Sequence, residues 1–232
     1  MRKTYGLLGV ALIAFAVLTA GMMKFATETS LYMSSWAFGS PIGALVAIAL
    51  FIGAATVAQR LAFSESSRGL QLAGLALYVG VQSFLLQPLL WILIANFGNR
   101  MALHHGVLMS GHVGAILMQA VVITLSIFVG LTLTVFITRK DFSFLRGVLT
   151  IGSFAVLGLC LASWLFGFSL GAFFCGFVVL LMAGYILMQT SQIMSSFPPT
   201  AHVGAALLLF STVATMFRFV LMILMQASSN RR

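Results

Sequence analysis

Long stretches without charge constrain this chain more than any other feature of its sequence. Residues 4–23, 29–59, 69–99, 101–138 and 147–217 contain no Lys, Arg, Asp or Glu. An α-helix needs about 20 apolar residues to cross the hydrocarbon core of a bilayer, and each stretch is long enough for at least one crossing. The stretches are continuously apolar rather than alternating, which argues against a transmembrane β-barrel. We therefore predict an all-α protein embedded in a membrane.

The composition of the whole chain supports this class. Apolar residues make up 61% of the 232 residues and charged residues 6%, too few to form a water-facing surface. There are 12 Lys and Arg but only three acids, Glu28, Glu65 and Asp141. Because the basic residues lie mostly singly between apolar stretches, we interpret the net charge of +9 as topology markers and expect no nucleic-acid partner. So few acids and histidines also lead us to expect no enzyme activity, metal or cofactor.

Turn signals divide the uncharged stretches into seven predicted spans within one membrane domain, residues 1–232. Glycine and serine near residues 167–171 break the longest stretch, and serine and proline near residues 195–199 break it again. The predicted spans are residues 5–26, 37–59, 70–95, 113–138, 147–166, 170–192 and 203–225. The first span follows Arg2 and Lys3 in the manner of a signal peptide, but its apolar run is longer than a usual signal core, so we expect it to be retained.

Basic residues also predict the orientation. An N-terminus on the cytoplasmic or matrix side places seven basic residues inside and four outside. The inner residues are Arg2, Lys3, Arg60, Arg68, Arg139, Lys140 and Arg146, and the outer ones are Lys24, Arg100, Arg231 and Arg232. The positions of Arg231 and Arg232 favour a last segment that returns to the inner side. The length of the last apolar segment favours a full crossing of the membrane, and we predict the crossing. The absence of an N-x-Ser/Thr glycosylation acceptor fits a bacterial or organellar inner membrane.

A polar loop joins the predicted fourth and fifth spans at residues 138–145, with the sequence TRKDFSFL. Arg139 and Lys140 lie at the end of a helix, where cations are favoured by the helix dipole and by the cytoplasmic side. Asp141 is placed to accept from backbone N–H groups two or three residues further on and to cap the next helix. These residues are thus typical of a simple turn between helices.

The same loop resembles the hallmark motif of the Bax inhibitor/YccA family of multi-pass membrane proteins. The matching residues are Thr138, Arg139, Lys140, Asp141, Phe142 and Ser143. Residues 86–90, LQPLL, and residues 184–193, GYILMQTSQI, resemble further family motifs. The resemblance covers about residues 70–225, and the first two spans fit by hydropathy alone. It implies a seven-helix fold and a non-enzymatic regulator or ion leak in membrane stress or protein quality control, with membrane-anchored proteases among the partners.

One departure from the family is informative. The resemblance implies a pH-sensitive calcium leak whose sensor is a pair of acids, and it places the first acid at Gln189 and the second at or next to Thr212. Two close carboxylates share protons and titrate together, whereas glutamine and threonine cannot change charge. Calcium also favours carboxylate ligands, and no predicted span contains one. We therefore expect a divergent member of the family, in which acidic pH does not steeply switch any ion transport.

A second function remains open: a non-conducting accessory subunit packed against a larger membrane complex. A lipid-facing set of aromatic residues would offer the contact surface for such a partner. The candidates are Phe173, Phe174 and Phe177 in the sixth span and Phe217 and Phe219 in the seventh.

Polar residues within the predicted spans form a candidate network. Six of them are expected to face the bundle, because an unpaired amide in lipid costs several kcal/mol: Gln82, Gln87, Gln119, Gln189, Thr212 and Thr215. We favour structural hydrogen bonding over a pore lining for this set. Arg218 fits snorkelling to the outer headgroups better than a bundle-facing charge, and Arg60 fits an interfacial anchor better than a hydrogen bond to Gln189.

The remaining chemistry-bearing residues favour structural interpretations. Cys160 and Cys175 match no zinc or redox spacing and are expected to be small buried thiols. In a helix, Met101, His105, Met109 and His112 would share one face, as a copper(I) site requires. No Cys, Asp or Glu completes such a site, so this segment with His104 is better explained as a solvated loop.

Overall fold

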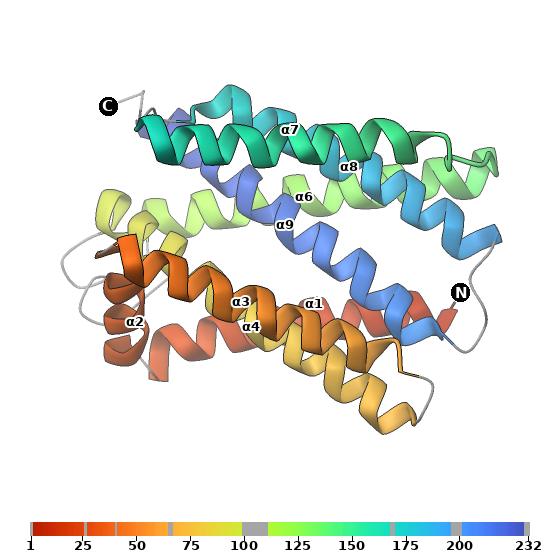
Figure 1. Ribbon diagram of the computed structural model, residues 1–232, viewed down its shortest axis with the longest axis horizontal. Coiled ribbons are helices and arrows are strands. Elements are labelled where there is room, and N and C mark those ends of the chain that lie inside the picture. The colour runs from red at the N-terminus through yellow and green to blue at the C-terminus, as the bar shows by residue number, and fades with distance from the viewer. Residues whose placement is uncertain are drawn as a thin grey trace. The chain divides into compact units, whose positions relative to one another are not determined.

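The computed structural model describes residues 2–25, 27–39, 41–64, 67–98, 111–167, 170–195 and 201–229, which form helices and short turns (Figure 1). The helices are α1 (Arg2–Phe25), α2 (Thr27–Gly39), α3 (Pro41–Ala62), α4 (Arg68–Phe97), α6 (Gly111–Thr138), α7 (Leu145–Phe166), α8 (Ala172–Ser195) and α9 (His202–Ser229). Seven of them, all but α2, are long and apolar enough to cross a membrane. The predicted all-α, multi-pass fold is confirmed.

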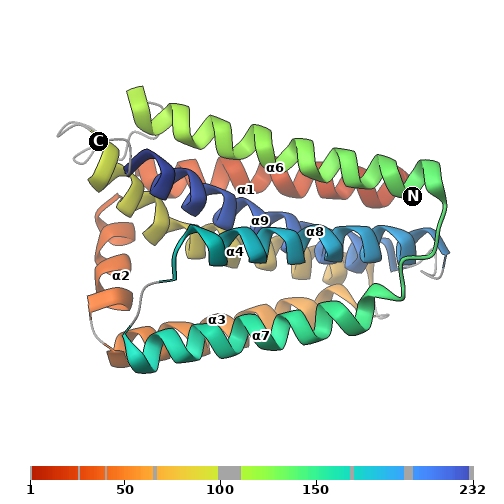
Figure 2. The ribbon, with the colours of Figure 1, turned by 90° about the horizontal axis from the view of Figure 1, so that it is seen from above.

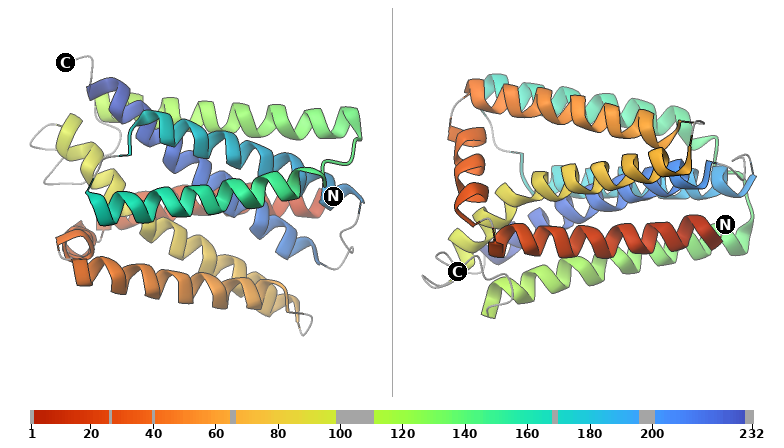
Figure 3. Two further views of the ribbon diagram at one scale, coloured as in Figure 1. Left: turned by 45° about the horizontal axis from the view of Figure 1, so that its top comes forward. Right: turned by 90° about the horizontal axis from the view of Figure 1, so that it is seen from below.

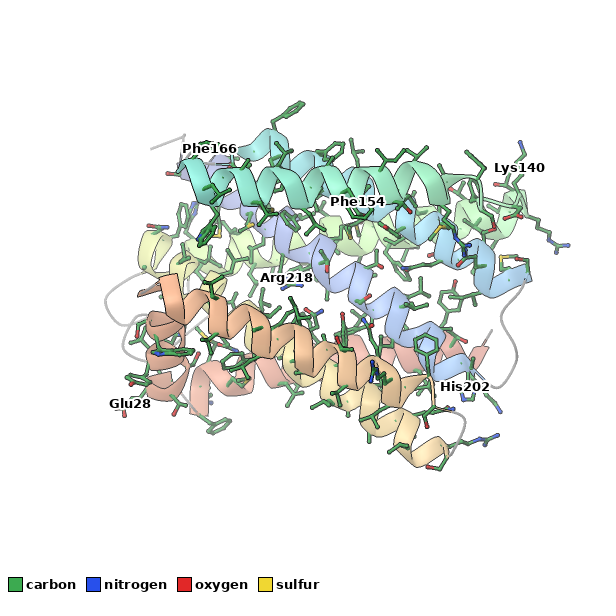
Figure 4. The ribbon with its side chains drawn as sticks, in the orientation of Figure 1. Glu28, Lys140, Phe154, Phe166, His202 and Arg218 are labelled. Carbon is green, nitrogen blue, oxygen red and sulfur yellow. The ribbon has the colours of Figure 1, made fainter. Side chains whose placement is uncertain are left out.

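The short helix α2 was not predicted. The predicted second span begins at residue 37 and leaves most of this segment in a loop, whereas α3 begins at Pro41. Proline is favoured at the first position of a helix, where its missing N–H is not needed, so it starts a new helix after α2 ends at Gly39. Glu28 lies in the first turn of α2, where a negative charge suits the helix dipole (Figure 4).

The chain forms two compact units. Unit 1 comprises Met1–Ala115 and Pro198–Phe210, and unit 2 comprises Ile116–Phe197 and Ser211–Arg232. Helices α6 and α9 therefore each contribute to both units. In unit 1, α4 packs against α1, α2 and α3, and α2 also contacts α1 and α3. Figure 2 and Figure 3 show α2 lying across one end of these longer helices.

The core of unit 1 surrounds Phe210, at the point where α9 leaves this unit. Its ring makes edge-on contacts with Phe15 of α1, at 5.7 Å between centroids, and with Tyr78 of α4, at 6.2 Å. All three side chains are buried. Edge-on aromatic pairs add roughly 0.5–1.5 kcal/mol to the burial of their apolar area. This cluster therefore joins the first, fourth and last helices of unit 1.

Backbones approach closely between α3 and α4. A Cβ atom added at Gly74 of α4 would lie 2.5 Å from the backbone nitrogen of Ala62 and 2.7 Å from the carbonyl oxygen of Ala58. Both alanines are buried in α3. Small residues at a membrane helix interface allow this approach, which increases van der Waals contact where lipid provides no hydrophobic drive.

In unit 2, α7 packs against α8 through Leu149, Leu181 and Met188. Each leucine occupies the space left by a glycine on the other helix. A Cβ at Gly152 would lie 2.6 Å from the side chain of Leu181, and one at Gly184 would lie 2.7 Å from that of Leu149. These reciprocal contacts set the register of the helix pair.

The start of α8 contacts α9. Phe174, Cys175 and Val178 form a buried cluster against Phe219 and Ile223. Before it, α7 ends at Gly167, whose left-handed backbone, with φ of 70°, directs its N–H to the carbonyl oxygen of Ser163. This confirms the predicted break at Gly167, since glycine adopts that conformation without strain.

An open apolar groove of about 460 Å³ lies between α7 and the start of α8. Its lining residues are Ala155, Leu159, Leu170, Gly171, Phe173, Phe174 and Phe177. Cys160 follows Leu159 in this part of α7 and is exposed, so the prediction that it is buried was wrong. The reason is that α8 does not cover α7 beside the groove. Cys175 is buried, as predicted.

Two further predictions about exposed and buried faces were wrong. Gln119 is exposed, because the buried residues of α6, among them Ile116, Ala120 and Thr124, lie on another side of the helix. The aromatic set is also divided. Phe173 is 93% exposed and Phe177 is partly exposed, but Phe174 and Phe217 are buried and Phe219 packs on Phe174.

Candidate functional site

Gln87 is the centre of a buried polar cluster in unit 1. Its side-chain oxygen accepts a hydrogen bond from the hydroxyl of Ser30 in α2 at 3.0 Å. Its nitrogen donates to the carbonyl oxygen of Thr19 in α1 at 3.3 Å. The indole N–H of Trp91 donates to the same Ser30 hydroxyl at 2.9 Å. Because Gln87 is only 1% exposed, these bonds replace water, and they join α1, α2 and α4.

Gln82, one turn earlier in α4, is buried like Gln87 and donates to the hydroxyl of Tyr78 at 3.0 Å. Both glutamines therefore face the interior, as expected from the cost of leaving an amide unpaired in lipid. Their partners are other side chains and backbone carbonyls. This pattern supports a structural role for the pair.

The two positions at which the resemblance implies acids meet in unit 2. The Thr212 hydroxyl in α9 donates to the side-chain oxygen of Gln189 in α8 at 3.0 Å. Thr212 is buried and Gln189 is half-buried. Both groups are neutral, so the contact is an ordinary hydrogen bond whose charge does not depend on pH.

Arg218 interacts one turn away from this pair. Its Nη2 donates to the hydroxyl of Thr215 at 3.4 Å, and that hydroxyl donates to the carbonyl oxygen of Ser211 at 2.8 Å. The guanidinium therefore reaches toward the N-terminal half of α9 and not toward Met225, as snorkelling to the outer headgroups would require (Figure 4). Arg218 is half-buried and this contact lies within its own helix, so snorkelling of the charge stays a prediction.

Arg60 is exposed in the last turn of α3, in agreement with an interfacial anchor. It belongs to unit 1, whereas Gln189 belongs to unit 2. The sequence favours this anchor over a hydrogen bond between these two side chains, and that preference stays a prediction.

The loop of residues 138–145 is held by hydrogen bonds to α8. The hydroxyl of Ser191 accepts from the backbone N–H of Phe142 and donates to the carbonyl oxygen of Lys140, both at 3.2 Å. Arg139 adopts a left-handed conformation, with φ of 51°. Its backbone N–H donates to the carbonyl oxygen of Val135 at 2.8 Å, which completes the last turn of α6. Ser191 was not singled out from the sequence, although it lies inside the family-like stretch 184–193.

Asp141 does not cap α7, contrary to the prediction. Its Oδ1 accepts from the backbone N–H of Ser143 at 2.9 Å and from the hydroxyl of the same residue at 2.6 Å. Helix α7 begins only at Leu145, and the position before it is Phe144, which has no side-chain cap. The carboxylate therefore accepts from the residue two positions on, but it stabilises the loop before the helix. This is the local turn that aspartate favours outside helices.

Hydrogen bonds from Ser143, first from its hydroxyl and then from its backbone N–H, lower the pKa of Asp141 below the ordinary value of 3.8. A carboxyl whose pKa is lower in the folded than in the unfolded state stabilises the fold above its ordinary pKa, and this contribution is lost as the pH falls through the folded value. We therefore expect the loop to keep its structure through neutral and mildly acidic pH and to loosen only below about pH 4.

The backbone amide resonance of Ser143, followed against pH by NMR in micelles, reports this transition directly. In Asp141→Asn the pH response of that amide should disappear. A midpoint of this amide titration near neutral pH would contradict the assignment of the transition to Asp141.

The histidine and methionine cluster lies mostly outside the described residues, which exclude Met101, His104, His105 and Met109. His112 is exposed in the first turn of α6, and its ring lies 5.9 Å from that of Phe97. Within the part of the chain that the structure describes, no group of His, Cys, Asp or Glu side chains could hold a metal ion.

These features define a class, a polytopic helical membrane protein with neutral polar contacts inside its helix bundle. The family model described as "Inhibitor of apoptosis-promoting Bax1" matches residues 1–230, so the chain belongs to the Bax inhibitor family. The match includes the first two spans, whose resemblance to the family by sequence rests on hydropathy alone. This is not a known family of enzymes.

Two curated relatives match parts of the chain. Bax inhibitor 1 of Schizosaccharomyces pombe is 32% identical over 120 residues, 50% of this chain and 44% of the relative. A Pseudomonas aeruginosa protein, described as uncharacterized, is 32% identical over 101 residues, 44% of this chain and 43% of the relative. The matched stretches thus span less than half the length of either relative. No solved structure gives a significant match.

Proposed function

We propose that this protein is a non-enzymatic membrane regulator acting in membrane stress or membrane-protein quality control, and that it has no acid-gated calcium leak. The main supporting observation is the neutral hydrogen bond between Thr212 and Gln189 at the positions where the resemblance implies a pair of acids. Neither side chain gains or loses a proton in the physiological range, so the pair cannot act as a proton-operated switch.

The distribution of acids supports the same proposal. Among the described residues, the acids are Glu28 in α2 and Asp141 in the loop, both exposed. A hard cation such as calcium takes six to eight oxygen ligands, usually including carboxylates. The polar side chains within the described spans instead hydrogen-bond largely to one another or to backbone carbonyls.

The proposal includes an orientation and a location. The N-terminus lies on the cytoplasmic or matrix side of a bacterial or organellar inner membrane, because that orientation places the larger number of basic residues inside. The loop with Arg139 and Lys140 then faces the same compartment. Membrane-anchored proteases are the partners that this role implies.

Calcium flux into proteoliposomes tests the proposal. The unmodified protein is expected to show no steep rise in flux between about pH 8 and about pH 6, the range in which a coupled carboxylate pair would titrate. A robust calcium leak with steep acid gating in the unmodified protein would overturn the proposal.

The double variant Gln189→Asp, Thr212→Asp provides the positive comparison. With the present atoms 3.0 Å apart, two carboxylates there could not both ionise, and one would keep its proton toward neutral pH. Flux that depends on pH is therefore expected only in the double variant. The single variants Gln189→Asp and Thr212→Asp are matched controls, since each introduces one acid without the pair.

A second candidate function is a non-conducting accessory subunit of a larger membrane complex. The observation that favours it is the open apolar groove of unit 2, beside which Phe173 and Phe177 are exposed. A partner helix would cover these rings. Absence of flux from the double carboxylate variant as well would favour this candidate over a leak that has lost its sensor.

A further inference from the structure

The loop between α6 and α7 carries more positive charge than its own acid can balance. Arg139 and Lys140 follow the last residue of α6, and Arg146 lies in the first turn of α7. All three side chains are exposed, and Figure 4 shows Lys140 pointing away from the helix ends. Among the described residues, none of the three side chains forms an ion pair or a hydrogen bond.

Asp141 is the acid within this segment, and it is already engaged. Its Oδ1 accepts both the backbone N–H and the hydroxyl of Ser143. These bonds keep the carboxylate directed at its own loop. Within the part of the chain that the structure describes, the three cations are therefore left without a paired counter-charge.

The loop is also too short to extend far from the ends of two candidate membrane spans. Both α6 and α7 are candidate membrane spans, and only residues 139–144 lie between them. Six residues extend at most about 20 Å, so a loop that leaves and returns reaches no more than about 10 Å from the membrane surface. This is close to the Debye length of about 8 Å at physiological ionic strength, within which charges on the loop interact with those on the membrane.

Two further features suit a membrane surface. Phe144 is 72% exposed at the start of α7, and its ring lies 6.3 Å from that of Phe142. An exposed phenylalanine beside cations can enter the boundary between headgroups and acyl chains. In addition, the two hydrogen bonds of Ser191 fix the backbone at Lys140 and Phe142. The cations thus project from an ordered turn, which lowers the entropy lost on binding.

We propose that Arg139, Lys140 and Arg146 form a binding site for the phosphate of an anionic lipid headgroup, such as phosphatidylglycerol. Arginine pairs with phosphate oxygens through two parallel N–H groups, and lysine adds a point charge. The acyl chains of the same lipid lie against the apolar surface of α7, where Val148 and Ile151 are exposed.

Native mass spectrometry of the full chain in a neutral detergent tests this site. The probes are dioctanoyl phosphatidylglycerol and, at equal concentration, dioctanoyl phosphatidylcholine, with inorganic phosphate as competitor. The unmodified protein is expected to retain the anionic lipid at least about tenfold better than the zwitterionic one, given the attraction of each basic residue near an anionic surface. Displacement of the lipid by equimolar inorganic phosphate would overturn the assignment to a lipid.

The triple variant Arg139→Gln, Lys140→Gln, Arg146→Gln should lose nearly all of this preference. A matched control, Lys3→Gln, Lys24→Gln, Arg68→Gln, removes the same charge from exposed residues elsewhere and should retain it. Equal loss in both variants would show an effect of net charge and overturn the proposal.

The single variants keep the test decisive if the triple variant does not fold. Each single substitution is expected to reduce the preference about twofold to fivefold, and replacing Arg139 or Arg146 with lysine should restore part of it. Three single variants that all keep the full preference would likewise overturn the site.

Discussion

Replacing Gly74 with alanine is expected to destabilise the protein by about 1–3 kcal/mol, because the new methyl group would overlap the backbone of α3. The contact between the two helices leaves no space for it, since the added Cβ would lie 2.5 Å from the nitrogen of Ala62 and 2.7 Å from the oxygen of Ala58. Backbone atoms in a helix cannot rotate away as a side chain can. Helices α3 and α4 would have to separate along their contact.

Gly80 in the same helix supplies the matched control. A Cβ there would meet nothing within 4 Å. Gly80→Ala should therefore be neutral or stabilise the protein by up to about 1 kcal/mol through the helix propensity of alanine. Unfolding of both variants in mixed micelles with increasing SDS, followed by circular dichroism, measures the difference. Equal stability of the two variants would contradict the close approach at Gly74.

Replacing Gln87 with alanine is expected to destabilise the protein by about 3 kcal/mol. The substitution removes the acceptor of the Ser30 hydroxyl and leaves a cavity between α1, α2 and α4. An unsatisfied buried polar group costs about 1–3 kcal/mol, and the cavity adds to that penalty. The effect is large because α2 is short and depends on this cluster for part of its attachment.

The same unfolding assay measures the effect of Gln87→Ala. Gln119→Ala serves as the control, because Gln119 is exposed on α6 and its loss should change stability by no more than about 0.5 kcal/mol. Similar changes in the free energy of unfolding for Gln87→Ala and Gln119→Ala would show that the polar cluster around Gln87 contributes little to stability.

Local sequence patterns were sufficient to predict the membrane spans. The uncharged stretches, together with breaks such as Gly167, predicted all seven long helices within about three residues of their observed ends, apart from the start of α3 and the end of α9. Hydropathy works here because every backbone group in a bilayer must pair within its own segment, which leaves the helix as the available structure. The loop motif likewise pointed to the family, since its residues are contiguous.

The short helix α2 shows where local pattern is insufficient. Its sequence, TETSLYMSSWAFG, mixes polar and apolar residues without a clear periodic face. Its position depends on contacts with α1, α3 and α4 and on the hydrogen bond from Ser30 to Gln87. Those partners lie far away in the sequence, so no window around α2 contains the information.

The resemblance could indicate that Gln189 and Thr212 matter together, and the sequence alone established that neither can titrate. Only the tertiary structure placed the Thr212 hydroxyl on the Gln189 amide, and only it showed Ser191 holding the loop at Lys140 and Phe142. The reason is the composition of the spans themselves. A helix that is apolar on every side carries no amphipathic pattern to set its rotation about its own axis. Which of its few polar residues meet, and which face outward as Gln119 does, is therefore decided by packing between helices.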